Sequence, residues 1–311
     1  MKVAMISRNE AGFPFDIPRR LRNEGVEIAC RRCETRKELT EFAADADLIW
    51  LFGANVCLDA EALEGLPRCR GLFRSGSGMD ALPCDAAQKR GIRLYNTPDS
   101  ISESVAEHAV ALLFSAARNI PEFDRQVREG KWDSSDSQTH WHLTGRTLAL
   151  IGYGRIARTV EKMVAGFSMH VIHFDPFAEG SVSLEDALRQ ADFVSLHCPL
   201  TPGTRHLIDA SRLALMKPGA LLVNTSRGAV IDEQALYEAL SSGRLGGAAL
   251  DVTEEEPLPA DSPLRTLRNV ILTPHCAAFS ADFSKNFFEF SYRKILAVRD
   301  EWRRDGLLPE A

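Results

Sequence analysis

Short apolar runs of strand length alternate along the chain with segments whose apolar residues recur every three or four positions. The runs predict buried strands, and the periodic segments predict helices that pack on them. The predicted strands are Lys2–Ser7, Val26–Cys30, Asp47–Phe52, Arg70–Arg74, Ile92–Tyr95, Thr147–Ile151, Met169–Phe174, Phe193–His197, Ala220–Val223, Leu245–Val252 and Val270–Leu272. This alternation indicates parallel sheets with helices on both faces, the doubly wound α/β class.

The pattern divides into two similar α/β halves, as a length of 311 residues suggests. Pro98 disfavours helix at the preceding residue and predicts a linker. Ser100 with Glu103 forms a capping-box pattern in front of an apolar stripe that continues to Ala116. Helices are also predicted at Phe15–Asn23, Ile231–Ser241 and Phe279–Trp302. We therefore place the boundary between the halves at residues 99 and 100.

The strand Thr147–Ile151 leads into G-Y-G-R-I-A at residues 152–157 and then into a helical segment. In this context G-x-G-x-x-A predicts a dinucleotide-binding turn. Gly152 permits a turn that a side chain would strain, Gly154 lets a pyrophosphate approach the backbone, and Ala157 allows close helix–strand packing. The helix N-terminus offers unpaired N–H groups and a positive dipole end to the phosphates.

An acidic residue ends the next predicted strand, where a ligand of the adenine ribose is expected. Asp175 follows Gly152 by 23 residues, and its carboxylate can accept hydrogen bonds from the ribose 2′-OH. The carboxylate would also repel a 2′-phosphate, and the adjoining Pro176 and Phe177 supply no arginine. The sequence therefore favours NAD over NADP.

The composition is that of an ordinary globular protein and argues against several classes of function. A net charge of −6 gives no electrostatic reason to expect nucleic acid. No apolar run approaches the ~18 residues of a membrane-spanning helix, and the N-terminus becomes polar too early for a secretory signal. Seven scattered cysteines suit a reducing cytoplasm. The Cys30–Cys33 C-x-x-C lacks a second pair, so we expect no metal site.

Polar residues follow three predicted strands of the second half, where a doubly wound sheet binds its ligands. These stretches are N-T-S-R-G at 224–228, D-V-T-E-E-E-P at 251–257 and T-P-H at 273–275. Arginine can hold a carboxylate and polarise a carbonyl, and histidine can exchange a proton near neutral pH. A carboxylate beside that histidine would favour the charged imidazolium. For any one of these residues taken alone, a surface salt bridge is the better interpretation.

Two other segments have alternative interpretations. The glycine-rich stretch R-S-G-S-G-M-D at 74–80 follows a strand, so it is either a ligand-binding loop or a turn that needs glycine. The segment Lys131–Leu143 carries two tryptophans and two histidines. It is either an arm that contacts a partner subunit or an ordinary surface loop.

Taken in order, these motifs resemble those of the D-isomer-specific 2-hydroxyacid dehydrogenases, which include D-3-phosphoglycerate, glycerate/hydroxypyruvate and D-lactate dehydrogenases. The similarity extends from about Arg70 to Ala281. The matching stretches are R-S-G-S-G-M-D (74–80), N-T-P (96–98), V-A-E-H-A (105–109), G-Y-G-R-I-A (152–157), S-L-H-C-P-L-T (195–201), M-K-P-G-A (216–220), N-T-S-R-G-A-V-I-D (224–232), L-D-V (250–252), E-E-P (255–257) and T-P-H (273–275).

The resemblance implies hydride transfer between nicotinamide and a D-2-hydroxy acid/2-oxo acid pair. It implies a flavodoxin-like substrate domain, residues 1–99 plus 284–311, and a Rossmann NAD-binding domain, residues 100–283. It also implies a homodimer formed through the nucleotide-binding domains. Two alternatives stay open: an NAD(H)-sensing binding protein of the corepressor type on the same scaffold, and a formate dehydrogenase. Formate dehydrogenases carry glutamine at the position of Glu256.

The resemblance also implies roles for individual residues. Arg227 would bind the substrate carboxylate and carbonyl, Glu256 would tune the acid/base, and His275 would be the acid/base. Ser75, Gly76 and Ser77 would give backbone contacts to the substrate carboxylate. The implied cofactor contacts, besides Gly152, Gly154 and Asp175, are Val105, Arg155, Ile156, Cys198, Pro199, Thr204, Thr225, Ser226 and Asp251, the last through the nicotinamide carboxamide. We interpret His108 and His197 as structural.

Departures from the family pattern concern the substrate. Phosphoglycerate dehydrogenases typically have an arginine at the position aligned with Leu51. Its absence, and the lack of a C-terminal regulatory domain in 311 residues, argue against phosphoglycerate. Phe52, Gly53 and Asn55 are instead expected to shape a pocket for a small or partly apolar 2-oxo acid.

Overall fold

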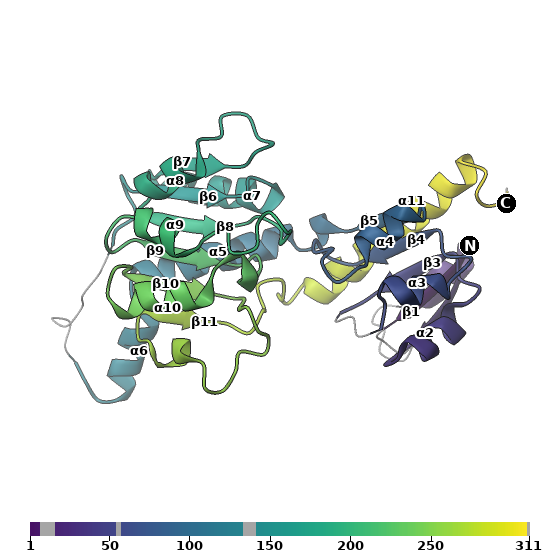
Figure 1. Cartoon of the computed structure of the whole chain (residues 1–311), viewed down its shortest axis with the longest axis horizontal. Helices are drawn as coiled ribbons and strands as arrows, with labels where there is room; N and C mark the ends of the chain where they lie inside the picture. The colour runs from purple at the N-terminus through teal and green to yellow at the C-terminus, as the bar shows by residue number, and fades with distance from the viewer. Residues whose placement is uncertain (7–15, 54–56, 133–140, 310–311) are drawn as a thin grey trace. The chain divides into compact units, whose positions relative to one another are not determined.

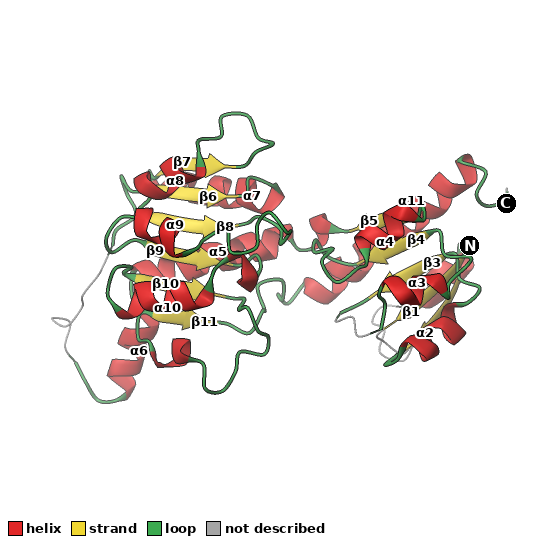
Figure 2. Cartoon of the chain, viewed as in Figure 1, coloured by secondary structure: helices red, strands yellow, loops and turns green. Residues whose placement is uncertain are grey.

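The computed structural model describes residues 1–6, 16–53, 57–132 and 141–309, and the chain forms two compact units. Unit 1 comprises residues 1–101 and 280–311, and unit 2 comprises residues 102–279. Both are parallel α/β structures, which confirms the predicted fold class (Figures 1 and 2). The unit limits differ by a few residues from the expected boundaries. Predictions that concern Phe15, Asn55 and most of the 131–143 segment, including His140, lie outside the described residues.

Unit 1 contains a five-stranded parallel sheet in the order β2-β1-β3-β4-β5. This is the flavodoxin-like order, and the direction of connection reverses between β1 and β3. The strands are β1 (Lys2–Ile6), β2 (Glu27–Arg31), β3 (Leu48–Leu51), β4 (Gly71–Arg74) and β5 (Arg93–Asn96).

Helices cover both faces of this sheet, as the apolar pattern requires. The helices α1 (Ile17–Asn23) and α11 (Phe283–Arg304) pack on one face, and α2 (Arg36–Ala43), α3 (Ala60–Glu64) and α4 (Cys84–Lys89) pack on the other. The long C-terminal helix is predicted from Phe279 but begins four residues later, at Phe283. Its Trp302 is fully buried, and the indole N–H donates to the Tyr95 hydroxyl at 2.8 Å. Residues from the far end of the chain therefore complete the core of unit 1.

Unit 2 contains a six-stranded parallel sheet in the order β11-β10-β9-β8-β6-β7. The direction of connection reverses between β6 and β8, so a ligand crevice is expected at the carboxyl ends of those two strands. The strands are β6 (Thr147–Ile151), β7 (His170–Phe174), β8 (Phe193–Leu196), β9 (Leu221–Asn224), β10 (Gly247–Leu250) and β11 (Val270–Leu272).

Helices also enclose the sheet of unit 2. The helices α5 (Ser102–Ala117) and α7 (Arg155–Val164) pack on one face, and α8 (Leu184–Gln190), α9 (Ala210–Leu215) and α10 (Glu233–Ser241) pack on the other. Short 3-10 turns occur at Pro98–Ser100, Ala165–Phe167, Gly228–Val230 and Pro263–Thr266. The capping box predicted the N-cap of α5 at Ser100, but the helix begins one residue later than that implies, at Ser102, and the Ser100 hydroxyl donates to the Thr97 carbonyl instead (2.6 Å).

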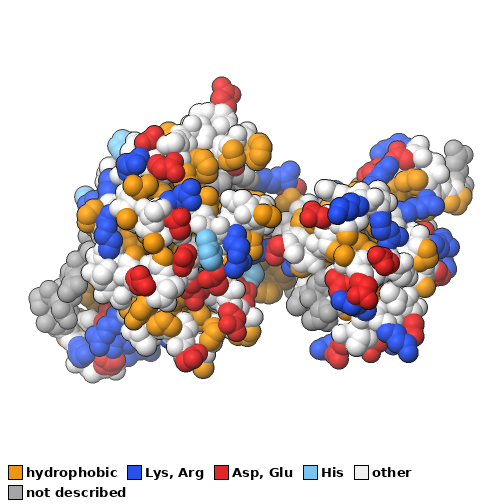
Figure 3. Space-filling view, viewed as in Figure 1, with side chains coloured by type: hydrophobic (Ala, Val, Ile, Leu, Met, Phe, Trp, Pro, Cys, Tyr) orange, Lys and Arg blue, Asp and Glu red, His pale blue; other side chains and the backbone are white. Residues whose placement is uncertain are grey.

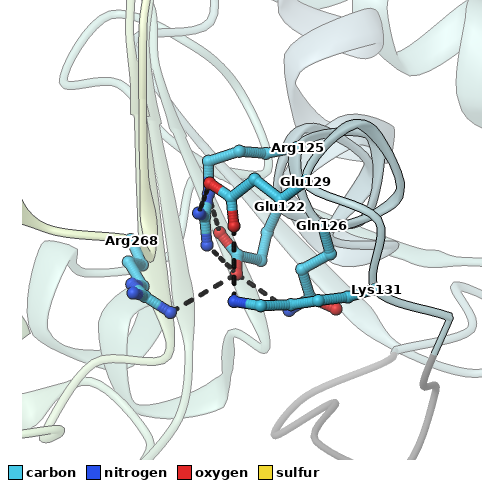
Figure 4. Close-up of polar contacts among 6 residues, drawn as sticks. All are labelled: Glu122, Arg125, Gln126, Glu129, Lys131 and Arg268. Atoms are coloured by element: carbon cyan, nitrogen blue, oxygen red, sulfur yellow. Dashed lines mark hydrogen bonds and ion pairs between the residues drawn. The ribbon is translucent and has the colours of Figure 1, made fainter.

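One helix of unit 2, α6 (Ile120–Arg128), is not predicted by the periodicity analysis and buries none of its residues. Figure 4 shows why its polar face is nevertheless ordered. Glu122 accepts hydrogen bonds from Arg125 (2.6 and 3.0 Å) and Gln126 (2.8 Å), and it forms an ion pair with Arg268 (3.8 Å) in the turn before β11. The apolar side chains of Ile120 and Val127 are 54% and 52% exposed.

Acidic and basic side chains are intermingled on the face drawn in Figure 3. Among the described residues, no helix is long and apolar enough to span a bilayer.

Candidate active site

The two glycines of the predicted dinucleotide turn are required for different reasons. Gly152 has φ +87°, and a Cβ there would lie 2.5 Å from the backbone nitrogen of Cys198. It is therefore required by the turn and by close contact with the segment after β8. Gly154 has an ordinary φ of −80°, and a Cβ there would meet no atom within 4 Å. The fold does not need glycine at that position, but an approaching ligand would.

Polar groups around this turn fit a dinucleotide. The N-cap residue of α7 is Gly154, which has no side chain to cap the helix, and the N-terminal end of a helix attracts phosphate groups. Asp175 accepts the N–H of Tyr153 (2.8 Å) and of Phe177 (2.9 Å), which fixes its carboxylate beside the turn. The hydroxyl of Thr225, after β9, is buried without a hydrogen-bond partner in the part of the chain that the structure describes. A bound ligand would satisfy it.

The remaining predicted cofactor residues lie at or near the carboxyl ends of the strands or in α5 and α7. Thr204 donates its hydroxyl to the Pro199 carbonyl (2.6 Å) and so shapes the turn after β8. Ser226 donates its hydroxyl to the Asn224 side chain at 2.8 Å. Burial raises the pKa of the Cys198 thiol to about 11, so the thiol stays neutral. Val105 is buried in α5, whereas Arg155 and Ile156 occupy the first turn of α7, with Arg155 exposed.

Asp251 is almost completely buried, and its carboxylate accepts hydrogen bonds from residues on both sides of His275 in the sequence. Oδ1 accepts hydrogen bonds from the Thr273 hydroxyl (2.5 Å) and the Cys276 N–H (2.9 Å), and Oδ2 accepts from the Ala277 N–H (2.9 Å). The His275 N–H donates to the Asp251 carbonyl at 2.8 Å. The sequence implies only a cofactor contact for Asp251 and does not predict this structural role.

His108, Asp251 and Cys276 place potential metal-binding atoms within 4.8 Å of one another. His108 Nε2 donates to Thr273 Oγ1 at 3.2 Å, and that hydroxyl in turn donates to Asp251. Since the chain's own donors already engage both carboxylate oxygens of Asp251, we assign no metal function to this group. The interpretation of His108 as structural agrees with its hydrogen bond.

Two of the three predicted catalytic residues, Glu256 and His275, are in direct contact. His275 donates from Nδ1 to Glu256 Oε2 at 2.7 Å, and both side chains are partly exposed. Glu256 is therefore the glutamate, of the three in sequence, that contacts His275. Burial acts to raise the pKa of Glu256, but the hydrogen bond and charge of His275, the Thr253 N–H and the charge of Arg227 together hold that pKa below its ordinary value. Arg227 is thus close enough for its charge to act on the same carboxylate.

His197 contributes to the fold rather than to the proton chemistry. Burial lowers the pKa of His197 to about 4, so its imidazole is neutral near pH 7. One ring nitrogen is hydrogen-bonded to the Ser195 hydroxyl at 2.9 Å. This agrees with its interpretation as a structural residue.

The predicted substrate loop lies in unit 1, after β4, and some of its groups are already engaged. The Gly76 N–H donates to the Thr97 hydroxyl (2.9 Å), and the Ser77 carbonyl accepts from Asn96 (3.0 Å). The Ser75 hydroxyl accepts from Trp50 (2.8 Å). Gly76 has φ +93°, so the turn needs glycine whether or not the loop binds a ligand.

Residues 110–277 match the model of the family described as D-isomer specific 2-hydroxyacid dehydrogenase, NAD binding domain. The chain belongs to this family. The finding confirms the resemblance drawn from the motifs, and the chain is accordingly an NAD-dependent oxidoreductase of 2-hydroxy acids.

Relatives in the family differ in the reaction that their names give. The chain is 41% identical to a glyoxylate reductase of Korarchaeum cryptofilum over 78% of this chain and 76% of the relative. It is 42% identical to a D-3-phosphoglycerate dehydrogenase of Methanocaldococcus jannaschii over 81% of this chain, but only 49% of that relative. The structure of the Aquifex aeolicus D-lactate dehydrogenase with NAD and lactic acid aligns with a TM-score of 0.83 at 27% identity, covering 96% of both chains.

The two glycines predict opposite mutant phenotypes. Gly154→Ala adds a methyl group to open space, so the free energy of unfolding should change by less than ~0.5 kcal/mol. The methyl group would hinder the pyrophosphate, so NADH affinity should fall at least about tenfold. Gly152→Ala strains the backbone and meets Cys198, so it should destabilise the fold by more than about 1 kcal/mol. Denaturant unfolding and NADH fluorescence titration measure the two effects. Unchanged NADH affinity in folded Gly154→Ala would contradict the assignment of the phosphate site.

Proposed function

We propose that the enzyme interconverts a small, apolar 2-oxo acid and its D-2-hydroxy acid, with His275 as the acid/base. The hydrogen bond between His275 and Glu256, beside the charge of Arg227, is the observation that carries the proposal. These residues follow β9, β10 and β11, which belong to the same parallel sheet as β6, the strand that leads into the dinucleotide turn. Arginine, carboxylate and histidine together are the groups that reduction of a 2-oxo acid requires.

Each side chain has a defined task in reduction. When NADH is bound, its nicotinamide supplies the hydride. Protonated His275 donates its proton to the carbonyl oxygen of the substrate, a contribution of roughly 10²–10⁴-fold. Arg227 binds the substrate carboxylate and polarises the carbonyl, and Glu256 stabilises the imidazolium through its hydrogen bond. In the oxidation direction, neutral His275 accepts the hydroxyl proton.

The aromatic side chains near the substrate loop of unit 1 support an apolar substrate. Phe52 stacks on Phe288 (centroids 5.2 Å apart) and meets Phe287 edge-on at 5.5 Å. Phe287 and Phe288 are buried, whereas Phe52 is partly exposed; a Cβ on Gly76 would lie 3.6 Å from Phe287, so this aromatic cluster adjoins the loop that we propose binds the carboxylate. Leu51 is fully buried, which means that its lack of charge says little about the substrate. Phe52, at the end of β3, is the better guide.

The cofactor preference and the cellular location follow from two further observations. Asp175 is fixed by two backbone N–H groups with its charge beside the turn, which favours a ribose hydroxyl over a 2′-phosphate. All seven cysteines are free thiols, and we propose a cytoplasmic location on that ground.

We also propose a homodimer formed through unit 2. The α6 helix presents an exposed apolar stripe that includes Ile120 and Val127, and Trp132 beyond it is 91% exposed. The polar network of Figure 4 holds the opposite side of this helix, so the apolar side is available to a second copy. Monomeric proteins rarely leave such a stripe uncovered.

A substrate panel tests the reaction. NADH oxidation is measured with glyoxylate, hydroxypyruvate, pyruvate, 3-phosphohydroxypyruvate and bulkier apolar 2-oxo acids, and the apolar acids should be preferred to the phosphorylated one. His275→Ala and Arg227→Ala should each lower kcat/KM by at least about 10²-fold while leaving the Kd of NADH within about twofold. A preparation that binds NADH but turns over none of these acids would instead favour the sensing alternative.

The pH profile tests the role of Glu256. Its pKa is lowered, so the carboxylate is charged near neutral pH, where it accepts the hydrogen bond from His275. Glu256→Gln removes the charge, so the alkaline decline of kcat/KM for reduction should move to lower pH by about one unit. The reduction rate is followed from pH 5 to 10 in both proteins. An unchanged alkaline limb would show that Glu256 does not act on the proton donor.

The dimer is tested at α6. Val127→Glu introduces a charge into the apolar stripe and should shift the protein to monomers in light scattering. Arg128→Ala changes the net charge by the same amount on an exposed polar position of the same helix, and it should leave the oligomeric state unchanged. If both variants remain dimers, the interface lies elsewhere.

A further inference from the structure

The glutamate two residues before Glu256 makes a distinct set of contacts. Glu254 Oε1 accepts a hydrogen bond from His206 Nε2 at 2.6 Å and lies 3.5 Å from Arg205. Its backbone N–H donates to Glu233 Oε2 (3.0 Å), and the Glu233 N–H donates back to Glu254 Oε2 (3.4 Å). Glu254 therefore joins the loop after β10 to the N-terminus of α10 and to the segment after β8.

The loop that carries Arg227 packs against the peptide bond between Thr253 and Glu254. A Cβ on Gly228 would lie 1.9 Å from the carbonyl carbon of Thr253 and 2.4 Å from the nitrogen of Glu254. No side chain fits in such a gap, so the backbone after Arg227 lies directly against the Thr253–Glu254 peptide. A displacement of that peptide would move the backbone next to Arg227 as well.

The same loop leads directly to Glu256. Thr253 donates its N–H to Glu256 Oε1 at 3.3 Å and its hydroxyl to the Glu255 carbonyl at 2.8 Å. Glu256 in turn contacts His275. The Thr253–Glu254 peptide thus contacts the backbone next to Arg227 and belongs to the loop that carries Glu256. Glu254 is the residue whose contacts hold this peptide in place.

We propose that Glu254 is a positioning residue, which holds Arg227 and Glu256 in the relative geometry that the reaction needs. The inference rests on the proposed function of those two residues. The alternative is an ordinary surface ion pair, whose loss would leave the activity unchanged. The Glu254 side chain is only 28% exposed, however, and its hydrogen bonds to Glu233 are reciprocal, which restricts its geometry.

Neighbouring glutamates provide the matched comparison. Glu254→Ala should lower kcat/KM about tenfold to 10²-fold, mainly through kcat, because misplacing a catalytic group by an ångström has effects of that size. Glu255→Ala, an exposed control, should stay within about twofold of wild type. Glu254→Gln retains an acceptor and should recover part of the loss. NADH affinity should be the same in all three. Equal activities of Glu254→Ala and Glu255→Ala would overturn the proposal.

A double-mutant cycle separates positioning from general destabilisation. If Glu254 acts through Arg227 and Glu256, the loss caused by Glu254→Ala should be smaller in a Glu256→Gln background and in an Arg227→Lys background than in the wild-type enzyme. An undiminished loss in both backgrounds would overturn the proposal. If Glu254→Ala does not fold, His206→Ala removes the hydrogen bond from His206 to Glu254 and takes its place in the cycle.

A readout without turnover distinguishes the failure of this inference from failure of the proposed function. The pH titration of the His275 imidazole, followed by NMR, should move in Glu254→Ala toward the midpoint found in Glu256→Gln. If the wild-type enzyme reduces a 2-oxo acid but the His275 midpoint is unmoved in Glu254→Ala, the positioning role is overturned and the proposed function stands. If the wild-type enzyme reduces none of the acids but the midpoint moves in Glu254→Ala, the positioning role is supported and the proposed reaction is contradicted.

Discussion

The buried carboxylate of Asp251 is the constraint on which the candidate site depends. A charge that is 1% exposed must be fully hydrogen-bonded, and here the partners are backbone and side-chain donors of the segment from Thr273 to Ala277. That segment has to fold back over the end of β10 to supply them. In doing so it carries His275 into a backbone conformation with φ +50° and brings its ring to Glu256.

The sequence identifies the chemical groups of the site more readily than their connections. Arg227, Glu256 and His275 can be predicted because polar residues directly after buried strands must gather at one edge of a parallel sheet. Which of three consecutive glutamates contacts the histidine is a matter of loop geometry, and only the family motif pointed to Glu256. The contact between Gly228 and the Thr253 peptide leaves no signal except a glycine. Likewise, the apolar pattern cannot reveal that His206 bonds to Glu254.

The prediction of the fold is most accurate where burial determines the spacing of apolar residues along the chain. The strands at Thr147–Ile151 and Val270–Leu272 have the predicted bounds, although the first is buried on both faces and the second is a partly buried strand at the edge of the sheet. The strand predicted at Leu245–Val252 is shorter, since its outer residues turn away to form loops. The α6 helix could not be inferred from an apolar stripe packed on a core, because it packs on none. Periodicity also predicts the C-terminal helix without indicating which unit it joins.

The return of the chain to unit 1 has a consequence for synthesis. The core on one face of that unit combines Trp50 and Phe73 with Phe288, Ile295 and Trp302 of α11. During translation the first hundred residues therefore leave the ribosome with that face uncovered, and they must wait for all of unit 2 before α11 arrives. At roughly 5–20 residues per second, this interval lasts on the order of ten to forty seconds. Throughout it, a nascent sheet with a bare aromatic face is a target for chaperones and for aggregation, whereas unit 2 is continuous in sequence and can fold as soon as it emerges.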